Sequence, residues 1–463
     1  MSAEPMIGAP ASGGLPHASL SLVAQALASL KLAVPIIIGQ LALIGLNVVA
    51  TLLMGRIGTQ AMAAGVLGNA FFFSMAVIAN GILSSTGVMV AQAEGRGDPQ
   101  RAAGYAQRGL LLALLLSVPA CAVLIGAPYF LAAIGQAPAQ VALTGRYLGT
   151  LAFAMVPYAM VLALRYFLAA VERPMMGTVT AIFGVGVEFI VGQMLLPMGV
   201  AGVGLAVAAG CLAMLLGMLV YLRLSVPLQV YGLFQRGRAQ AGQMGDLWRI
   251  GWPMGVAFGA ETLFFMLTTT LAGYFTLPEI AAHSIGYQSI ITAFMIAVGL
   301  SHATMVRVAR AAGEGDIVAV RRIGWAGIML GWLGMGGTGL VLALGGRWIA
   351  ARFLDPAVGD AATVFDFAAP LLVIAALFQL FDGTQAIAAG ALRGLKDTRG
   401  PMVIGLIAYW PVGMASGALL AFTLDLRLIG LWSGLALGLA VAAVALTVRF
   451  HVRSRHLPAS AKG

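Results

Sequence analysis

Residues 81–98 read GILSSTGVMVAQAEGRGD, and residues 299–316 read GLSHATMVRVARAAGEGD. The two stretches align without gaps at a shift of 218 positions, and 9 of their 18 positions are identical. The same shift pairs Pro35 with Pro253. Apolar composition alone does not explain shared Gly, Pro and Asp positions, so the pattern predicts two halves that repeat one fold.

The composition is typical of a membrane protein. Of 463 residues, 60% are hydrophobic and 9% are charged, and the mean hydropathy is +0.97. A soluble domain carries roughly 25% charged residues. A bilayer core needs about 20 apolar residues per helical crossing. On that rule the sequence predicts twelve spans, near residues 31–54, 63–93, 105–130, 143–170, 175–196, 200–223, 250–275, 280–311, 323–345, 363–393, 401–423 and 428–449.

The repeat and the spans together predict the domain organisation. Each half holds six spans, an even number, so both halves have the same orientation and form a parallel repeat. The predicted fold is an all-α integral membrane protein with two six-helix lobes. We expect a disordered tail at 1–24, an N-terminal lobe at 25–223, a linker at 224–248, a C-terminal lobe at 249–450 and a second tail at 451–463.

The basic residues indicate the orientation in the membrane. The termini and the loops after even-numbered spans carry 21 of the 26 Lys and Arg residues. The exceptions are Arg56, Arg146, Arg347, Arg352 and Arg427. Positive residues favour the cytoplasmic side, so both termini are expected there. The net charge of +10 therefore reflects topology, and we expect no nucleic-acid partner.

The sequence carries no pattern that predicts an enzyme. Cys121 and Cys211 lie in apolar runs, and the five histidines have no metal-ligand spacing. No nucleophile elbow, phosphate-binding loop or dinucleotide-binding motif is present. We therefore expect a protein that is not an enzyme and that needs no cofactor.

Three acidic residues lie deep inside predicted spans: Glu188, Glu261 and Asp382. A charge at the centre of a membrane helix costs about 2.5–3.5 kcal/mol on insertion scales, so such residues normally face the protein interior and have a function. The sequence is compatible with two roles for Glu188: a functional carboxylate, or an acid whose hydrogen bonds are satisfied by neighbouring helices. For Glu261 and Asp382 the alternative to a functional role is a structural hydrogen bond between helices.

The helical spacing predicts what surrounds the two acids of the second half. Positions three, four and seven residues apart share one face of a helix. Glu261 therefore shares its face with Phe264, Phe265 and Thr268, and Asp382 shares its face with Phe378, Gln379 and Gln385. Aromatic rings beside a carboxylate can bind a flat, hydrophobic cation through charge and cation–π contacts. The repeat-equivalent of Glu261 is Leu43, so the duplication alone did not place these acids.

Several of these segments resemble one family, the multidrug and toxic compound extrusion (MATE) transporters, in its bacterial NorM-like branch. FQLFDGTQAIAAGALRGLKDTRGPM at 378–402 resembles the family's tenth helix. The segment from Ile280 to Asp316 resembles the eighth helix and its loop, and GAETLFF at 259–265 resembles the seventh. AYWPVGMASGALL in the eleventh span is similar as well. The resemblance covers about residues 25–450.

The resemblance implies two lobes around a central cleft in the bacterial inner membrane. Entry of Na⁺ or H⁺ would drive export of organic cations by alternating access, through a protein expected to be a monomer in membrane lipid. Glu261 and Asp382 match the family's coupling positions, where a Na⁺ ion would bind, and Glu188 is a further candidate. Phe265, Tyr287, Gln288, Phe378 and Gln385 are implied to line the substrate cleft.

The chain also departs from the family pattern. Many members carry an aspartate in the first helix, in a pattern like V-D-T-x-x-x-G, where this chain has Ala50. The fifth helix usually has an asparagine where this chain has Glu188, and an aromatic hydroxyl before the tenth-helix acid is absent at Phe378. This chain therefore lacks the aspartate that usually couples transport in the first lobe, and both Na⁺ and H⁺ remain candidates for the driving ion.

Two other functions are compatible with the spans. A lipid-linked oligosaccharide flippase of the same superfamily would need a large basic cleft for pyrophosphate, whereas most charges within these spans are acidic; Arg165 is the one exception. A membrane enzyme or a receptor would need a reactive cluster or a soluble module, and the sequence offers neither.

Overall fold

The computed structural model describes residues 21–235, 240–353 and 361–456. The predictions for residues 1–20, 236–239 and 457–463 lie outside the described residues. Within the described residues, 12 helices are long and apolar enough to cross a membrane. This confirms the predicted number of spans and the all-α fold class. Helices are the expected solution, because a backbone in lipid must satisfy its hydrogen bonds internally.

The N-terminal lobe contains the first six of these helices. They are α1 (Leu22–Ile57), α2 (Thr59–Gly95), α3 (Pro99–Ala133), α4 (Pro138–Ala170), α5 (Met175–Leu195, continued by the 3₁₀ turn Leu196–Met198) and α6 (Val200–Leu224). A short helix, α7 (Val226–Gln229), follows in the connection to the second lobe.

The C-terminal lobe contains the other six. They are α8 (Gln243–Ala272), α9 (Leu277–Glu314), α10 (Ile317–Phe353), α11 (Ala361–Gly394), the composite helix α12–η3–α13–η4 (Arg399–Ile407, Ala408–Met414, Ala415–Ala418, Leu419–Thr423) and α14 (Arg427–Arg453). Packing within the lobes agrees with the repeat: α2 packs on α3 and α4, and α9 packs on α10 and α11.

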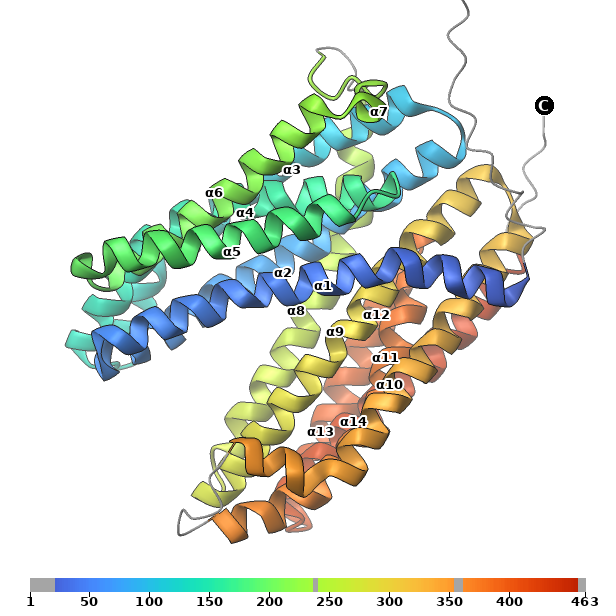
Figure 1. Ribbon diagram of the computed structural model, residues 1–463. Helices are drawn as coiled ribbons and strands as arrows, with labels where there is room; N and C mark the ends of the chain where they lie inside the picture. Colours follow the sequence, from blue (N-terminus) through green and yellow to red (C-terminus); the bar gives the residue numbers. More distant parts are fainter. Residues whose placement is uncertain (1–20, 236–239, 354–360, 457–463) are drawn as a thin grey trace, which may run out of the picture.

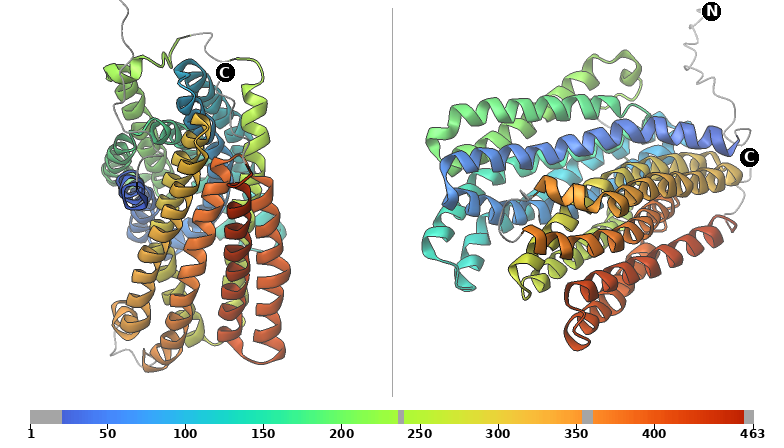
Figure 2. Two further views of the ribbon diagram at one scale, coloured as in Figure 1. Left: turned by 90° about the vertical axis from the view of Figure 1, so that its right-hand side faces the viewer. Right: turned by 60° about the horizontal axis from the view of Figure 1, so that its bottom comes forward.

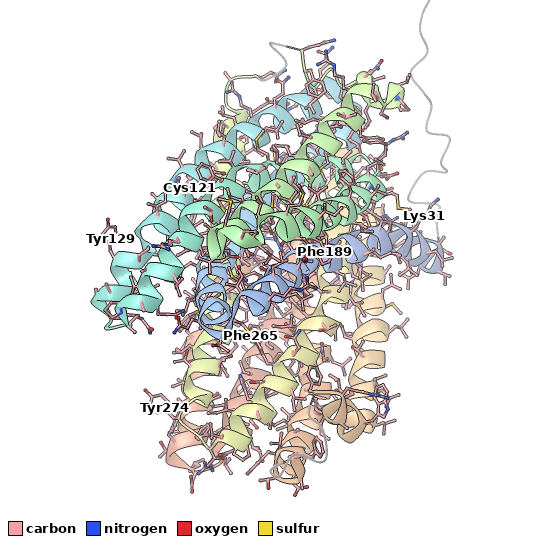
Figure 3. The ribbon with its side chains drawn as sticks, turned by 60° about the vertical axis from the view of Figure 1, so that its left-hand side comes forward. Lys31, Cys121, Tyr129, Phe189, Phe265 and Tyr274 are labelled. Atoms are coloured by element: carbon pink, nitrogen blue, oxygen red, sulfur yellow. The ribbon has the colours of Figure 1, made fainter. Side chains whose placement is uncertain are left out.

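The two lobes meet along one half of the molecule and diverge toward the other. In Figure 1 they come together at the right and separate toward the lower left, and Figure 2 gives two further views of the arrangement. Most contacts between the lobes join α1 to α9 and α10, and α2 to α8 and α9, with smaller contacts of α3 with α8 and of α4 with α9. We call this region the junction. Figure 3 places Tyr129 at the far tip of the N-terminal lobe and Tyr274 at the far tip of the C-terminal lobe.

Reciprocal contacts at the junction relate the two halves. A Cβ atom added to Gly95 of α2 would overlap the backbone oxygen of Arg310 in α9, and one added to Gly313 of α9 would overlap that of Gln92 in α2. Gly95 and Gly313 are 218 positions apart, as are Gln92 and Arg310. Two halves related by a parallel repeat would produce this exchange of partners.

Polar contacts also tie the lobes together at the junction. The Arg310 Nη1 atom lies 2.8 Å from Glu172 Oε1 of the other lobe. The Gln92 Nε2 atom donates to the Gly394 backbone oxygen over 3.1 Å. The buried Arg307 guanidinium of α9 donates to Gln25 in α1. These three contacts therefore connect residues of the two lobes at the junction.

The repeated Gly-Asp pair has a structural reason. Gly97 and Gly315 lie just after the ends of α2 and α9 with φ of 70° and 76°, a region that glycine adopts without a Cβ clash. Asp98 and Asp316 then begin the next helix: their side chains accept hydrogen bonds from the backbone N–H of Arg101 at 2.9 Å and from that of Ala319 at 2.8 Å. Aspartate is a preferred residue at that position, so this part of the repeat specifies a tight helical corner.

The helices extend beyond the predicted domain boundaries. The first helix begins at Leu22, where Ser21 accepts a hydrogen bond from the Ala24 N–H at 3.3 Å, inside the predicted tail 1–24. The helix α8 begins at Gln243, inside the predicted linker 224–248, and α14 continues to Arg453. Apolar windows detect only the part of a helix that lies in lipid, which accounts for the difference.

Candidate cation site in the C-terminal lobe

The structure brings Glu261 and Asp382 together through one amide. The Gln385 Nε2 atom donates to Glu261 Oε1 over 2.9 Å and to Asp382 Oδ1 over 3.3 Å. The Gln385 Oε1 atom accepts a hydrogen bond of 2.9 Å from the Tyr409 hydroxyl. Glu261 lies on α8, Asp382 and Gln385 lie on α11, and Tyr409 lies on η3. Three helices thus contribute to a single polar cluster, which we call the carboxylate cluster.

Most of the carboxylate cluster is shielded from solvent. Asp382, Gln385 and Tyr409 are 2%, 3% and 4% exposed, whereas Glu261 is only half-buried. Asp382 and Gln385 are one helical turn apart, so one face of α11 presents both. In low-dielectric surroundings a carboxylate needs a hydrogen-bond or charge partner. Gln385 supplies that partner to both acids at once.

The local geometry of η3 places Tyr409. Residues 408–414 form a π-helix that contains Pro411. Proline has no N–H for the helical ladder, and π-helical turns are frequent at functional sites. The Tyr409 ring stacks on Phe264 of α8, with centroids 5.4 Å apart and planes inclined by 14°. This stacking fixes the ring that orients Gln385.

An aromatic cluster lies beside the carboxylate cluster. Its members are Phe265, His283, Tyr287, Phe378 and Trp432. The ring of Phe265 lies 6.0 Å from that of Phe378 and 6.2 Å from that of Tyr287, between centroids. His283 stacks on Tyr287 at 5.8 Å, and Trp432 lies 6.3 Å from Phe378. Faces of such rings attract organic cations.

Hydrogen bonds fix the tautomer of His283 within the aromatic cluster. The indole Nε1 of Trp432 is a donor only, and it lies 3.1 Å from His283 Nδ1. The Nδ1 atom is therefore the acceptor, and the proton lies on Nε2. That atom contacts the Thr269 hydroxyl at 3.1 Å. The imidazole is thus neutral here and holds Trp432 in place.

The structure sorts the residues predicted from the sequence into two groups. Phe265, Tyr287, Phe378 and Gln385 lie within or beside the two clusters, as described above. The side chain of Gln288 is exposed, and no hydrogen bond among the described residues joins it to either cluster. Along α9 it lies one position beyond Tyr287, so it points to a different face.

Glu188 lies in the other lobe. It is fully buried on α5, and both carboxylate oxygens lack a hydrogen-bond partner among the described residues. A Cβ atom added to Gly210 of α6 would lie 3.0 Å from the Glu188 Cβ atom. It therefore does not join the carboxylate cluster.

Sequence reasoning missed Tyr409, His283 and Trp432. Tyr409 precedes a proline inside an apolar span, in AYWPVGM at 408–414, and that proline was the available signal. His283 has no metal-ligand spacing in the sequence, and its partner Trp432 lies 149 residues away. No spacing rule connects two such distant positions.

Two helical lobes and a buried acidic cluster lined by aromatic rings define a class of protein, the membrane transporters with two repeated six-helix bundles. A family model described as MatE matches residues 35–194 and 253–419. The chain belongs to the MatE family, in its NorM-like group.

Relatives from bacteria support this assignment over nearly the whole chain. A probable multidrug resistance protein NorM from Pseudomonas putida is 37% identical over 439 residues, which is 93% of this chain and 95% of that protein. Another, from Rhizobium meliloti, is 38% identical and covers 94% of each chain. A multidrug resistance protein NorM from Burkholderia vietnamiensis is 36% identical over 95% of this chain and 96% of that protein. The spans and these relatives indicate a multi-pass bacterial membrane protein.

Solved structures share the fold. A multidrug resistance MATE family transporter in an outward-facing conformation superposes with a TM-score of 0.84 at 17% identity, covering 94% of this chain and 97% of that one. A eukaryotic MATE transporter gives a TM-score of 0.83 at 19% identity, covering 94% and 98%. The two-lobed arrangement in Figure 1 is therefore that of known MATE transporters.

Proposed function

We propose that the protein is a secondary active multidrug efflux transporter. It exports amphipathic organic cations in exchange for inward Na⁺ or H⁺ by alternating access. The observation that carries this proposal is the buried amide of Gln385 shared between Glu261 and Asp382, next to the aromatic cluster. The names of the relatives, multidrug resistance proteins, support the same function.

The geometry suggests how two cations exclude each other. The donor that now bridges the carboxylates is the Gln385 amide nitrogen, which lies within 3.3 Å of both. An incoming cation must displace this nitrogen or turn the amide so that its oxygen faces the ion. Two positive ligands at one site repel each other. Occupancy by the driving ion therefore expels a bound organic cation, and the reverse holds on the other side of the membrane.

The same oxygen atoms suit either driving ion. The carboxylates of Glu261 and Asp382, the amide oxygen of Gln385 and the hydroxyl of Tyr409 are hard ligands of the kind that small oxygen-seeking cations prefer. A proton needs only one of the carboxylates. Among the described residues there is no group of three or more His, Cys, Asp or Glu residues that could hold a metal ion, so a dedicated transition-metal site is not part of the proposal.

Glu188 is the candidate for ion coupling in the N-terminal lobe. In α5, Gly192 packs against Leu53 of α1, and Glu188 lies one turn earlier in α5. Ala50 lies one turn before Leu53 on the same face of α1. Glu188 is thus level with the position where many family members have an aspartate, and its unpartnered oxygens can accept a cation. We propose that it replaces that aspartate.

Alternating access would use the junction as its inner gate. In this structure the lobes are in contact at the junction and diverge at the other end (Figure 1). We assign the junction to the cytoplasmic side of the bacterial inner membrane, with both termini there, from the distribution of Lys and Arg. The transporter then faces outward, and inward opening separates α2 from α8 and α9. We propose that it works as a monomer.

The test is dye efflux in a bacterial host that lacks its own multidrug pumps. Cells that make the protein should lose a cationic dye faster than cells with the empty vector. Membrane vesicles given either a sodium gradient or a pH gradient then identify the driving ion. Absence of efflux under both gradients, with the protein present in the membrane, rejects the proposal and favours the flippase alternative.

A further inference from the structure

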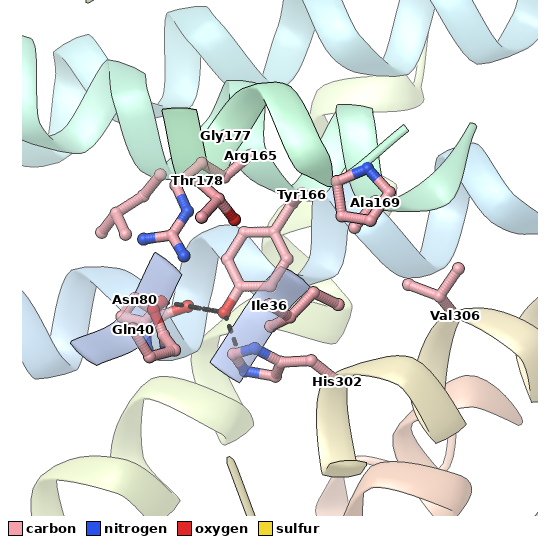
Figure 4. A pocket seen from close by; sticks show the side chains of 12 residues that line it. Ile36, Gln40, Asn80, Arg165, Tyr166, Ala169, Gly177, Thr178, His302 and Val306 are labelled. Atoms are coloured by element: carbon pink, nitrogen blue, oxygen red, sulfur yellow. Dashed lines mark hydrogen bonds between the residues drawn. The ribbon is translucent and has the colours of Figure 1, made fainter. Parts of the chain in front are cut away.

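A polar cavity lies between the lobes, within the junction and apart from the carboxylate cluster. It has a volume of about 30 Å³, measured as the space open to the centre of a water molecule. Helices α1, α2, α4 and α5 of the N-terminal lobe line it on one side, and α9 of the C-terminal lobe lines it on the other. Figure 4 shows that Arg165, Gln40, Asn80, Tyr166 and His302 surround it.

The guanidinium of Arg165 has no counter-charge at this cavity. Its Nη1 atom is buried and has no hydrogen-bond partner among the described residues, and no ion pair among those residues includes it. A buried cation without a compensating partner costs several kcal/mol. A charge kept in this position therefore points to a ligand of the opposite sign.

A second buried arginine nearby provides a contrast. Arg393 of α11 donates to the backbone oxygens of Ala389 at 3.0 Å and Ala386 at 3.3 Å. Its guanidinium lies 4.9 Å from the centroid of the Phe258 ring. Arg393 therefore keeps two hydrogen bonds to backbone oxygens, although its Nη1 atom also lacks a partner, whereas Arg165 makes no hydrogen bond within the part of the chain that the structure describes.

The polar groups around Arg165 leave donors directed at the cavity. The Tyr166 hydroxyl donates to Asn80 Oδ1 over 2.8 Å. The same hydroxyl oxygen lies 3.4 Å from His302 Nε2, which must then be the donor in that contact. The Asn80 amide oxygen is therefore used by Tyr166, and the Tyr166 oxygen is used by His302. The amide N–H groups of Asn80 and Gln40 remain as donors beside the guanidinium.

We propose that this cavity binds a small monovalent inorganic anion, chloride in the cell, held by the Arg165 guanidinium and by the amide N–H groups of Asn80 and Gln40. A cavity must offer roughly 10–15 Å³ to the centre of a water molecule to hold one water. A cavity of about 30 Å³ therefore admits one halide ion with a water, and it excludes a phosphate ester or an organic acid.

The location of the cavity gives the anion a consequence for conformation. His302 belongs to α9 of the C-terminal lobe, and the other four groups belong to the N-terminal lobe. His302 and Val306 of α9 form one wall of the cavity, so the cavity exists only while the lobes are in contact at the junction. A ligand that binds one state better than another shifts the population toward that state. Chloride therefore stabilises the conformation described here.

The test measures thermal unfolding of the purified protein in detergent while chloride replaces gluconate at constant ionic strength. Gluconate has the same charge but is too large for the cavity. We expect a saturable rise in apparent Tm of about 2–4 °C with chloride, and the same with bromide. The rise should persist in Arg146→Gln, which removes an exposed arginine from the same helix, and should vanish in Arg165→Gln.

Two results overturn the proposal. One is equal Tm in chloride and gluconate for the wild-type protein, which means that the cavity holds water only. This result does not depend on any variant folding. The other is an undiminished chloride effect in Arg165→Gln, which places the anion elsewhere. Crystals grown with bromide give a direct check, because the anomalous signal should appear next to Arg165.

Discussion

Replacing Gly81 with alanine should push the lobes apart at the junction. A Cβ atom at this position would lie 2.7 Å from the Met254 backbone oxygen and 2.8 Å from both Gly255 Cα and Phe258 Cδ2. Ordinary van der Waals contact begins at 3.4 Å, so α2 and α8 must separate by 3.4 − 2.7 = 0.7 Å. Overpacking of this kind costs about 1–3 kcal/mol. That energy shifts an equilibrium between two conformations roughly 5- to 150-fold.

The assay is the distance between spin labels at the tips of the lobes. Tyr129 and Tyr274 are 81% and 77% exposed and lie at separate tips in Figure 3, so cysteines there can be labelled in a cysteine-free background. Gly81→Ala should move the distance distribution toward shorter values, because opening the junction brings the outer tips together. The control is Gly126→Ala, where an added Cβ meets nothing within 4 Å. An unchanged distribution in Gly81→Ala, or an equal change in both variants, refutes this reasoning.

Three further predictions concern topology, coupling and stability. A single cysteine at Ala137 should react with an impermeant thiol reagent added outside cells, and one at Gln240 should not, because the two positions lie on opposite sides of the membrane. Glu188→Gln should reach the membrane at normal levels but lose ion-driven efflux, because it cannot hold a coupling charge. Arg427→Met should lower the apparent Tm more than Arg352→Met, because only Arg427 makes a two-pronged ion pair, at 2.8 and 2.6 Å, with a buried glutamate.

Each of these predictions has an outcome that contradicts it. Labelling at both cysteine positions, or only at Gln240, rejects the proposed orientation. Normal efflux by Glu188→Gln leaves its carboxylate with a structural role only. Equal Tm values for the two arginine variants mean that the ion pair at the ends of α9 and α14 contributes nothing measurable.

The sequence was sufficient to locate the membrane spans and the acidic residues inside them. Lipid requires long apolar helices, and a charge inside such a helix stands out against them, as Glu261 and Asp382 do. The repeated Gly-Asp pairs at 97–98 and 315–316 also predicted two related halves. In the structure both pairs form the same helical corner, which is why the same residues recur at both places.

The remaining features depend on contacts between distant segments. Gln385 bridges two acids 121 positions apart in the sequence, since 382 − 261 = 121, and no periodicity reveals that bridge. Tyr409 contributes because a π-helical segment turns it toward Gln385. Arg165 looked like an exception to the acidic spans. Its lack of a partner is visible only when the surrounding helices are in place.

The central claim is that Glu261 and Asp382 bind the driving cation and the exported cation in turn. Glu261→Gln and Asp382→Asn each keep the side-chain volume and remove the charge. The measurement is ion-driven efflux of a cationic dye from vesicles with matched amounts of each variant. Asp425→Asn, an exposed acid of the same lobe, serves as the control. We predict that the first two variants export no dye and that the control exports it normally. Efflux at the wild-type rate by either Glu261→Gln or Asp382→Asn would contradict the role of that residue.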